Sequence, residues 1–424
     1  MHMIMSFSDP ELHGDIAWML AATALVLLMT PGIGFFYGGL VNRKNAYTIV
    51  IQSILVMCLA GTIWPILAYS LAFGPSMLGG LIGNFDYVAL QNTWNHAGLK
   101  IPSQLDMIFE CTFAIVAAAL VIGGFAERLK LSAFCLFIPL WILFVYCPVA
   151  HWLWGNHLGE NTFFSLKNKG TLDFAGGMVV HLNAGVAAFV AGCVIGPRAE
   201  YKSKKSSVTH LHFCLLGVSL IWFGWLGFNA GSAGAANEVA ATALVNTIFA
   251  AAMGGLAWVA IEYIRSKHIT APGLAAGVVA GLVAITPACG FVQPMSSLAI
   301  GALASGVSYT AMYIINERFR CDDSLDVFSV HGMSAIWGAL ATGLFATLAV
   351  NPEGDNGLFY GNASQLFDQL RGILYVLIWS GGVSFLLLKL IDWSIGLRCH
   401  PDHETLGLDS AQFGLKSNTS SSDP

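Results

Sequence analysis

Charged side chains are scarce in this sequence. Only 10% of the 424 residues are charged and 56% are hydrophobic, whereas soluble domains usually carry about a quarter charged residues. An ordinary water-soluble protein is therefore excluded, because it could not hide so much apolar surface from water. A lipid bilayer is the natural solvent for such a chain. The 46 glycines agree with this, since small residues favour close helix packing in lipid.

An excess of basic residues is also missing. The formal net charge is −5, which argues against a nucleic-acid partner, because phosphate binding needs a basic surface. The nine cysteines include no C-x-x-C pair, and most lie in apolar runs, among them Cys58, Cys135, Cys193 and Cys214. We interpret them as small buried hydrophobic residues, not as disulfides or metal ligands. No cleavable signal peptide is expected, since residues 1–14 lack a basic segment.

Long apolar runs are abundant instead. Eleven of them exceed about 17 residues, the lower limit for a helix that spans a bilayer. Backbone groups cannot stay unpaired in lipid, so each run should be helical. We predict an all-α polytopic membrane protein, with a transmembrane domain over residues 1–396 and eleven helices at 16–41, 46–73, 104–126, 131–152, 174–195, 209–231, 239–264, 271–289, 294–316, 328–350 and 372–396.

Basic residues set the expected orientation. With the N-terminus outside, the cytoplasmic segments hold 14 of the 19 lysines and arginines, a clear positive-inside signal. We therefore expect a multi-pass protein of the cell membrane whose residues 397–424 form a cytoplasmic tail. The 14 residues are Arg43, Lys44, Arg128, Lys130, Arg198, Lys202, Lys204, Lys205, Arg265, Lys267, Arg318, Arg320, Arg398 and Lys416.

The number of runs predicts an internal repeat. Ten runs precede the last one, and ten divides into five plus five. An odd number of spans in each half inverts the second half relative to the first. We expect inverted repeats over about 16–195 and 209–350, followed by a final helix at 372–396. The fifth and tenth runs would then occupy matching positions.

One histidine lies deep in each of these two runs, His181 in the fifth and His331 in the tenth. Ionisable groups inside a membrane are costly and usually face a cavity or each other. Matched positions would bring the two imidazoles together near the midplane, where neutral rings can hydrogen-bond in series and pass a proton. Each histidine could instead cap or cross-link helices. A metal site is a third possibility, although neither helix offers a second close ligand.

Aromatic residues gather toward the expected outer ends of three helices. An outer aromatic cluster could select a small cation by its charge without using a carboxylate, because aromatic faces attract cations. The alternative is interfacial anchoring, which tryptophans at helix ends commonly provide. The residues are Phe109 and Phe113 in the third run, Trp152 and Trp154 at the end of the fourth, and Trp222, Trp225 and Phe228 in the sixth.

Three acidic residues lie near the ends of these runs. Asp173 begins the fifth helix and Asp326 precedes the tenth, so each could be an ordinary N-cap, where a carboxylate pairs with free backbone N–H groups. Glu110 lies one turn outward of Phe113. It could attract cations to an entrance, or it could simply be solvated.

Several stretches closely resemble the ammonium transporter family (Amt/Mep/Rh), and specifically its Amt branch. They occur in the family's order over about 300 residues, and two short tail segments match as well. The stretches are Met29–Asn45, Ala126–Arg128, Asp173–His181, Gly227–Gly234, Asp322–Gly332, Gly396–Arg398 and Gly407–Asp409.

The resemblance implies a role for each candidate residue. His181 and His331 would line the pore as a pair, below a stacked gate of Phe113 and Phe228. Trp154 and Ser232, together with Phe113, would recruit ammonium from outside. The further residues implied are Trp225 as a pore-lining aromatic and Asp173 as electrostatic and structural support, a role that we also expect for Asp326.

The resemblance also implies the activity and the partners. Ammonium would be recruited, deprotonated and conducted as ammonia, with or without a relayed proton, by a homotrimer with one pore per subunit. No enzymatic activity, cofactor or metal is expected, and a PII-type signalling protein would dock on the cytoplasmic face. Two alternatives remain: an ammonium sensor that signals through a separate partner, and a membrane metal enzyme, which typically needs three or more converging ligands.

Overall fold

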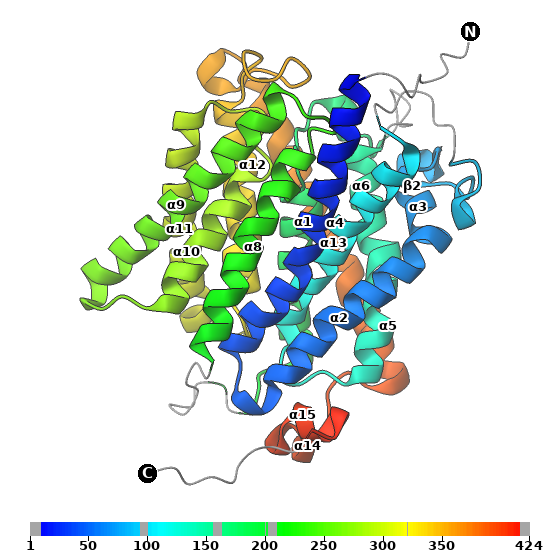
Figure 1. The fold of residues 1–424 in the computed structure, drawn as a ribbon. Helices are drawn as coiled ribbons and strands as arrows, with labels where there is room; N and C mark the ends of the chain where they lie inside the picture. The colour runs from blue at the N-terminus through cyan, green and yellow to red at the C-terminus, as the bar shows by residue number, and fades with distance from the viewer. Residues whose placement is uncertain are drawn as a thin grey trace.

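The computed structural model describes residues 10–93, 101–155, 163–199, 201, 210–319 and 321–415. Within these residues the long elements are all helical, and the two strands are a short antiparallel pair, β1 (Ser76–Met77) and β2 (Ile82–Gly83). Figure 1 shows the helices side by side in a single bundle. The predicted all-α polytopic fold is confirmed.

Ten helices in the described residues are long and apolar enough to cross a membrane, and the eighth predicted span is the shorter apolar helix α10. The spans include several with a π-helical segment, labelled η below. In chain order they are α1 (Pro10–Leu40); α2 (Ala46–Ile63) with η2 (Trp64–Ala68) and α3 (Tyr69–Phe73); α4 (Ser103–Phe125); α5 (Leu131–Trp141) with η5 (Ile142–Tyr146) and α6 (Cys147–Trp154); η7 (Gly177–Leu182) with α7 (Asn183–Ile195); α8 (Leu211–Gly231); α9 (Glu238–Ser266); α10 (Ala271–Ile285); α11 (Pro294–Ile314) with η8 (Ile315–Phe319); η9 (Phe328–Met333) with α12 (Ser334–Phe345); and α13 (Ser364–Ile395).

Two helices have ends that differ clearly from the predicted spans. The eighth run continues to residue 289 in sequence, but α10 ends at Ile285 and turns follow, with Pro287 just beyond. Proline removes a backbone donor and disfavours continued helix. The last helix instead begins eight residues earlier than predicted, at Ser364.

Small residues set the spacing between α1 and α8. A Cβ atom at Gly39 would lie 2.4 Å from the backbone nitrogen of Cys214, and one at Gly217 would lie 2.2 Å from that of Phe36. The two backbones therefore touch where side chains are absent, as is common between helices in lipid. This close packing joins the first span to the sixth, the two helices that begin the predicted halves.

The two histidine-bearing spans share an unusual start. Each opens with six residues of π-helix, η7 before α7 and η9 before α12, and then continues as ordinary α-helix. Single π-turns inside α-helices occur often at functional sites. His181 lies in η7 and His331 in η9, so the matched positions expected from the sequence share the same local backbone form.

The tail packs as two short helices, α14 (Pro401–Leu406) and α15 (Leu408–Phe413). Figure 1 places them below α2 and α5, at the opposite end of the bundle from the start of α1. We call this end the tail side. The other end, where the outer cavity described below opens, is called the vestibule side. The sequence analysis assigns the tail side to the cytoplasm.

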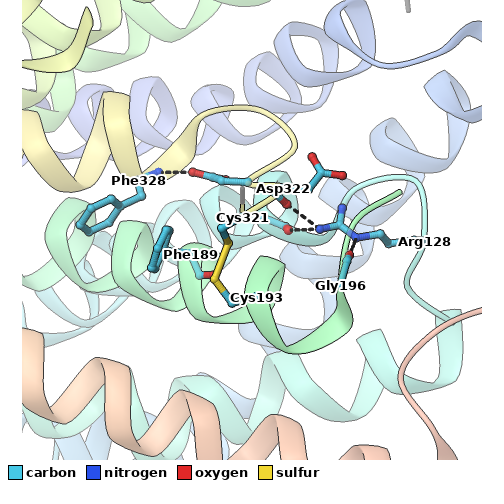
Figure 2. Close-up of a disulfide and its surroundings, with 9 residues drawn as sticks. Arg128, Phe189, Cys193, Gly196, Cys321, Asp322 and Phe328 are labelled. Carbon is cyan, nitrogen blue, oxygen red and sulfur yellow. Dashed lines mark hydrogen bonds between the residues drawn. A yellow bond between two sulfur atoms is a disulfide. The ribbon is translucent and has the colours of Figure 1, made fainter. Parts of the chain in front are cut away.

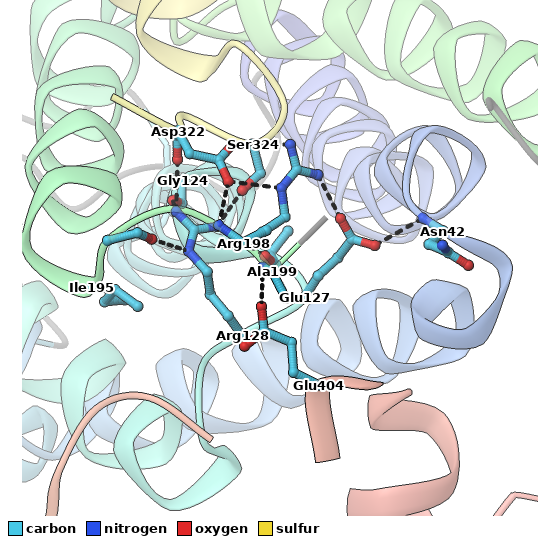
Figure 3. A network of polar contacts seen from close by, with 12 residues as sticks. Asn42, Gly124, Glu127, Arg128, Ile195, Arg198, Ala199, Asp322, Ser324 and Glu404 are labelled. Atoms are coloured by element: carbon cyan, nitrogen blue, oxygen red, sulfur yellow. Dashed lines mark hydrogen bonds and ion pairs between the residues drawn. The ribbon is translucent and has the colours of Figure 1, made fainter. Parts of the chain in front are cut away.

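A polar network lies on the tail side (Figure 3). Arg198 pairs with Asp322 at 2.9 Å and with Glu127 at 2.5 Å. Glu127 also accepts from the backbone nitrogen of Asn42 at 2.9 Å, and Glu404 of the tail accepts from the backbone nitrogen of Ala199 at 2.7 Å. The network therefore joins the loop after α1, the loop after α4, the end of α7, the loop before η9 and the tail.

The cysteine prediction is wrong for Cys193, which forms a disulfide with Cys321 (Figure 2). The two residues are 128 positions apart, and spacing along the sequence cannot show that α7 and the loop before η9 meet. They meet closely, since a Cβ on Gly192 would lie 2.8 Å from the carbonyl oxygen of Asp322. Of the other cysteines named above, Cys214 is buried as predicted, Cys58 is exposed and Cys135 is half-buried.

Candidate functional site

A cavity of about 370 Å³ opens on the vestibule side. Its walls include the first turns of α4, the end of α6 and the residues that follow α8, and α4 runs from here to the network on the tail side. The cavity brings together three residues expected to act jointly, Phe113, Trp154 and Ser232. Other residues around it are Met19, Phe73, Asp106, Phe109, Glu110, Leu153, Lys167, Thr171, Leu172, Asp173, Phe174, Gly231, Gly234, Phe291, Asn351 and Glu353.

Trp154 is fixed by two contacts. Its ring meets the ring of Phe113 edge-on, with centroids 5.7 Å apart and an interplanar angle of 89°. Its indole N–H donates to the backbone oxygen of Asp173 at 2.9 Å. The orientation leaves two aromatic surfaces on the cavity, and such surfaces stabilise a cation best where it is partly desolvated.

Asp173 supports this arrangement from behind. Its Oδ2 accepts from the backbone nitrogens of Met178 at 2.9 Å and Val179 at 3.0 Å, in the first turns of the fifth span. Asp173 therefore pairs with the free backbone N–H groups as predicted, although Gly176 and not Asp173 occupies the N-cap position. Burial raises the pKa of Asp173 to about 6, and the backbone N–H groups of Val179 and Met178 oppose that rise.

Ser232 offers an acceptor to the cavity. Its hydroxyl donates to the backbone oxygen of Phe228 at 2.9 Å, one turn earlier in the chain. A hydroxyl group that donates its proton to a hydrogen bond can still accept one through the lone pairs of its oxygen. A small cation with N–H donors could therefore donate to Ser232 while it faces the rings of Phe113 and Trp154.

Two stacked phenylalanines close the floor of the cavity. The rings of Phe113 and Phe228 have centroids 4.2 Å apart and an interplanar angle of 29°, and both residues are buried. Phe109 contacts Phe113 from the side, with centroids 4.9 Å apart. Passage beyond the cavity therefore requires these rings to move.

The two histidines touch directly below this stack. The Nδ1 atoms of His181 and His331 lie 3.4 Å apart, their ring centroids are 5.4 Å apart, and both residues are buried. When both rings are neutral, one Nδ1 must carry the proton that the other accepts. The rings therefore adopt complementary tautomers and form a short chain along which a proton can be exchanged.

Trp225 forms a wall beside His181. The two rings stack with centroids 4.9 Å apart and an interplanar angle of 16°, and the indole N–H donates to the hydroxyl of Thr286 at 2.9 Å. The Nε2 atom of His181 is buried and has no hydrogen-bond partner among the described residues. An unpaired buried nitrogen is costly, so a molecule in the passage could provide the missing bond.

A small inner cavity of about 10 Å³ follows the histidines. It can hold about one water molecule. Its walls are almost entirely apolar apart from the two imidazoles, so a hydrated ion does not fit. The residues around it are Met29, Ile33, Phe36, Tyr37, Val116, Leu120, His181, Ile221, Trp225, Val279 and His331.

Comparison with known proteins decides the family. The model of the Ammonium Transporter Family matches residues 17–418. The chain belongs to this family. It is 41% identical over 406 residues to an ammonium transporter of Bacillus subtilis (strain 168), across 95% of this chain and 98% of that one. It is 40% identical over 399 residues to ammonium transporter Amt1 of Archaeoglobus fulgidus, across 94% and 97%.

Solved structures agree with this assignment. Mep2 of Saccharomyces cerevisiae superposes with a TM-score of 0.85 at 32% identity, covering 94% of this chain and 93% of Mep2. A structure described as a sensor Amt protein superposes with a TM-score of 0.87 at 28% identity, covering 95% and 98%. The family resemblance of the motifs is therefore confirmed, and this ammonium transporter family member is a multi-pass membrane protein.

The other candidate residues line the outer or the inner cavity or stack between them, but Asp326 does not. Its Oδ1 accepts from the side-chain amide of Asn316 at 3.2 Å. The N-terminal turn of η9 is capped instead by Asp323, whose Oδ2 accepts from the backbone nitrogen of Phe328 at 2.6 Å. The N-cap interpretation of Asp326 is wrong, because the loop places Asp323 nearer the free N–H groups.

Sequence reasoning missed the tail-side network and the place of Lys167 in the wall of the outer cavity. Each of Glu127, Arg198 and Asp322 lies in a separate loop, so only the fold shows that they are partners. Lys167 comes from the connection between the fourth and fifth spans and lines the outer cavity. Charged loop residues so close to apolar runs were the available signal. The described residues contain no group of three or more His, Cys, Asp or Glu that could hold a metal ion.

Proposed function

We propose that this family member takes up ammonium from the vestibule side and conducts ammonia through the histidine-lined passage to the tail side. One observation carries the proposal: the contacting histidine pair lies between a closed phenylalanine stack and an apolar cavity with room for about one water molecule. Such a passage suits a small neutral molecule and not a hydrated ion.

Recruitment would occur in the outer cavity. Ammonium has four N–H donors and one positive charge, and there it meets the hydroxyl of Ser232 and the faces of Phe113 and Trp154. These groups replace part of its hydration shell through one hydrogen bond and cation–π contact. Potassium carries the same charge but has no N–H group to donate, so the hydroxyl would favour ammonium.

Deprotonation would precede passage. A charge inside an apolar pore costs several kcal/mol even on mild insertion scales, whereas neutral ammonia is small and can pass when Phe113 and Phe228 move apart. Ammonia could donate to or accept from the unpaired Nε2 of His181. The released proton either returns to the vestibule or crosses through His181 and His331, whose Nδ1 atoms are in contact.

The deciding experiment is an electrical recording on proteoliposomes under an inward ammonium gradient, with potassium as the control ion. We expect an ammonium-dependent current and no potassium current if the proton crosses with ammonia. His181→Ala and His331→Ala should abolish the selective, relay-coupled current. Undiminished ammonium currents in both variants would contradict the relay, and the absence of any ammonium flux in the unmodified protein would contradict the function.

The wider assembly belongs to the same proposal. We infer inverted repeats over about 16–195 and 209–350, a cell-membrane location with a cytoplasmic tail, a homotrimer with one pore per subunit, and a PII-type protein on the tail side. The matched π-helical starts of the fifth and tenth spans support the repeat. The basic residues of the tail-side loops support the orientation.

Sensing is the second candidate function. The superposition on the structure described as a sensor Amt protein covers 95% of this chain. In that case ammonium would bind in the vestibule and the tail would change its contacts with little flux through the pore. Flux in the same proteoliposomes separates the two, since a sensor would bind ammonium without sustained transport.

A further inference from the structure

Glu110 has no part in the pathway described so far, although it lies in the vestibule wall. It follows Phe109 on α4 and stands one helical turn from Phe113, toward the vestibule side. The three side chains all line the outer cavity. The carboxylate is therefore placed next to the aromatic recruitment site, on the side from which a cation would arrive.

The structure separates the two interpretations that the sequence left open for this residue. The Oε2 atom of Glu110 is buried and has no hydrogen-bond partner in the described structure. A solvated carboxylate would have water at both oxygens. A buried carboxylate oxygen without a partner costs free energy, and buried charges in proteins are normally paired.

The charges around the cavity favour a cation as the missing partner. Its lining includes four carboxylate residues, Asp106, Glu110, Asp173 and Glu353, against a single lysine, Lys167. Asp106 lies one turn before Glu110 on α4. The cavity therefore carries an excess of acidic groups where the family's aromatic site alone would need none.

Lys167 already provides one positive charge that acts on Glu110. Burial lowers the pKa of Lys167, and the negative charges of Glu353 and then Glu110 oppose that shift. The lysine ammonium is thus shared between the negative charges of Glu353 and Glu110. A second, mobile ammonium group could therefore gain from Glu110 an interaction that Lys167 does not saturate.

We propose that Glu110 is a substrate-binding residue, a carboxylate subsite that holds ammonium one helical turn outward of Phe113, Trp154 and Ser232. This inference rests on the proposed function and extends its recruitment step. The ligand class is a small monocation with N–H donors, because a charge-assisted hydrogen bond to a carboxylate is stronger than a neutral one. Ammonium would pass from this carboxylate to the aromatic site, where it gives up its proton.

The test compares Glu110→Gln with the unmodified protein, using methylammonium uptake into proteoliposomes and methylammonium binding followed by calorimetry. Glutamine keeps the size and a hydrogen-bonding oxygen but removes the charge. We expect about tenfold weaker binding and an equal rise in the half-saturation concentration, with the maximal rate within about twofold. Glu110→Asp should recover part of the affinity, and Trp222→Phe, outside both cavities, should change neither quantity.

A second variant keeps the test decisive if Glu110→Gln does not fold. Lys167→Gln removes the competing ammonium group without altering Glu110, so we expect about twofold to threefold tighter binding. This gain would not follow from a merely structural role of Glu110. Unchanged binding in both Lys167→Gln and a folded Glu110→Gln, or a loss of maximal rate at unchanged affinity, would overturn the proposal.

The two readouts separate this inference from the proposed function. Binding that depends on Glu110 without any flux would support the subsite and contradict the transport function. Flux whose half-saturation concentration is the same with and without the Glu110 charge would support transport and contradict the subsite. The absence of both binding and flux in the unmodified protein would overturn both proposals.

Discussion

At the scale of single residues, the site depends on side chains whose orientation is fixed by backbone partners. Trp154 is held by the carbonyl of Asp173, and Trp225 is held by the hydroxyl of Thr286. Both indoles therefore present their faces without losing further conformational freedom when a ligand arrives. Preorganisation of this kind raises affinity because fewer groups must be ordered on binding.

The first prediction concerns Trp154. Trp154→Leu keeps an apolar side chain but removes the aromatic face, so apparent affinity for ammonium should fall by roughly threefold to tenfold, since partly exposed cation–π contacts are worth about 1 kcal/mol. Uptake measured at low external ammonium should show the loss, and uptake at saturation should not. Trp222→Leu is the matched control. An unchanged concentration dependence would remove Trp154 from the recruitment site.

The second prediction concerns Asp323. Burial, followed by the charge of Asp326, raises the pKa of Asp323 to about 7, above the value of about 3.9 in an unfolded chain. The folded protein then binds more protons between these values, so its stability should fall as pH rises from about 4 to about 7. In Asp323→Asn, which still accepts from Phe328, thermal unfolding in detergent should depend less on pH. Equal pH slopes for both proteins would contradict this.

At the scale of elements, the pairing of α1 with α8 rests on bare backbone contact at Gly39 and Gly217. No side chain can enter these points unless the helices separate. Overpacking of this kind typically costs about 1–3 kcal/mol. The wall of the inner cavity includes residues of both helices, among them Ile33 and Ile221, so the spacing of the helices also sets the width of this cavity.

The third prediction follows from this spacing. Gly39→Ala should destabilise the protein, because the added Cβ would lie 2.4 Å from the backbone nitrogen of Cys214. Gly382→Ala on α13 is the control, since nothing lies within 4 Å of its added Cβ. Thermal unfolding in detergent should occur at a lower temperature for the first variant only. Equal unfolding temperatures would show that the helices separate without cost.

The tail is a second element whose position depends on a few bonds. Asp409 accepts from the backbone nitrogen of Thr48 at 2.6 Å, from its hydroxyl at 2.7 Å and from the backbone nitrogen of Tyr47 at 3.2 Å. Carboxylate bonds to the first N–H groups of a helix are stabilising. Asp409 thereby attaches α15 to the start of α2.

The fourth prediction tests this attachment. Asp409→Ala should release the tail helices, because three acceptor contacts are lost together. Limited proteolysis of the purified protein should then cut residues 397–415 faster than in the unmodified protein, by several-fold. Asp402→Ala is the control, since Asp402 is exposed at the other tail helix. Equal cutting rates would show that other contacts hold the tail.

At the scale of the whole molecule, the sequence predicted what depends on burial and repetition. Apolar runs located the spans, because a bilayer demands helices of a minimum length. The pairing of His181 with His331 followed from their matching positions in a five-plus-five chain, and the structure brings them together. Glu110 could be placed next to Phe113 from helical spacing alone, but its unpaired oxygen could not be foreseen.

The remaining features depend on which loops meet. Asp322 and Asp326 are four positions apart, yet Asp322 pairs with Arg198 while Asp326 faces Asn316. Loop conformation decides between such neighbours, and periodicity does not describe loops. The contact of Cys193 with Cys321 has the same origin, since both depend on how the end of α7 packs against the loop before η9. Long-range pairing of this type requires the fold.

The disulfide has a consequence for how the chain is connected. The Cys193–Cys321 bond closes a covalent ring that contains α8, α9, α10 and α11. A protease that cuts between the two cysteines, for example at Lys202, Lys204 or Lys205, would leave the two fragments joined. On a denaturing gel the nicked protein should migrate as one species until a thiol reductant is added, and then as two. If the tail side faces a cytosol that keeps thiols reduced, and thiols are alkylated before the cells are lysed, the nicked protein should give two fragments without added reductant. The assay therefore also reports which compartment the tail side faces.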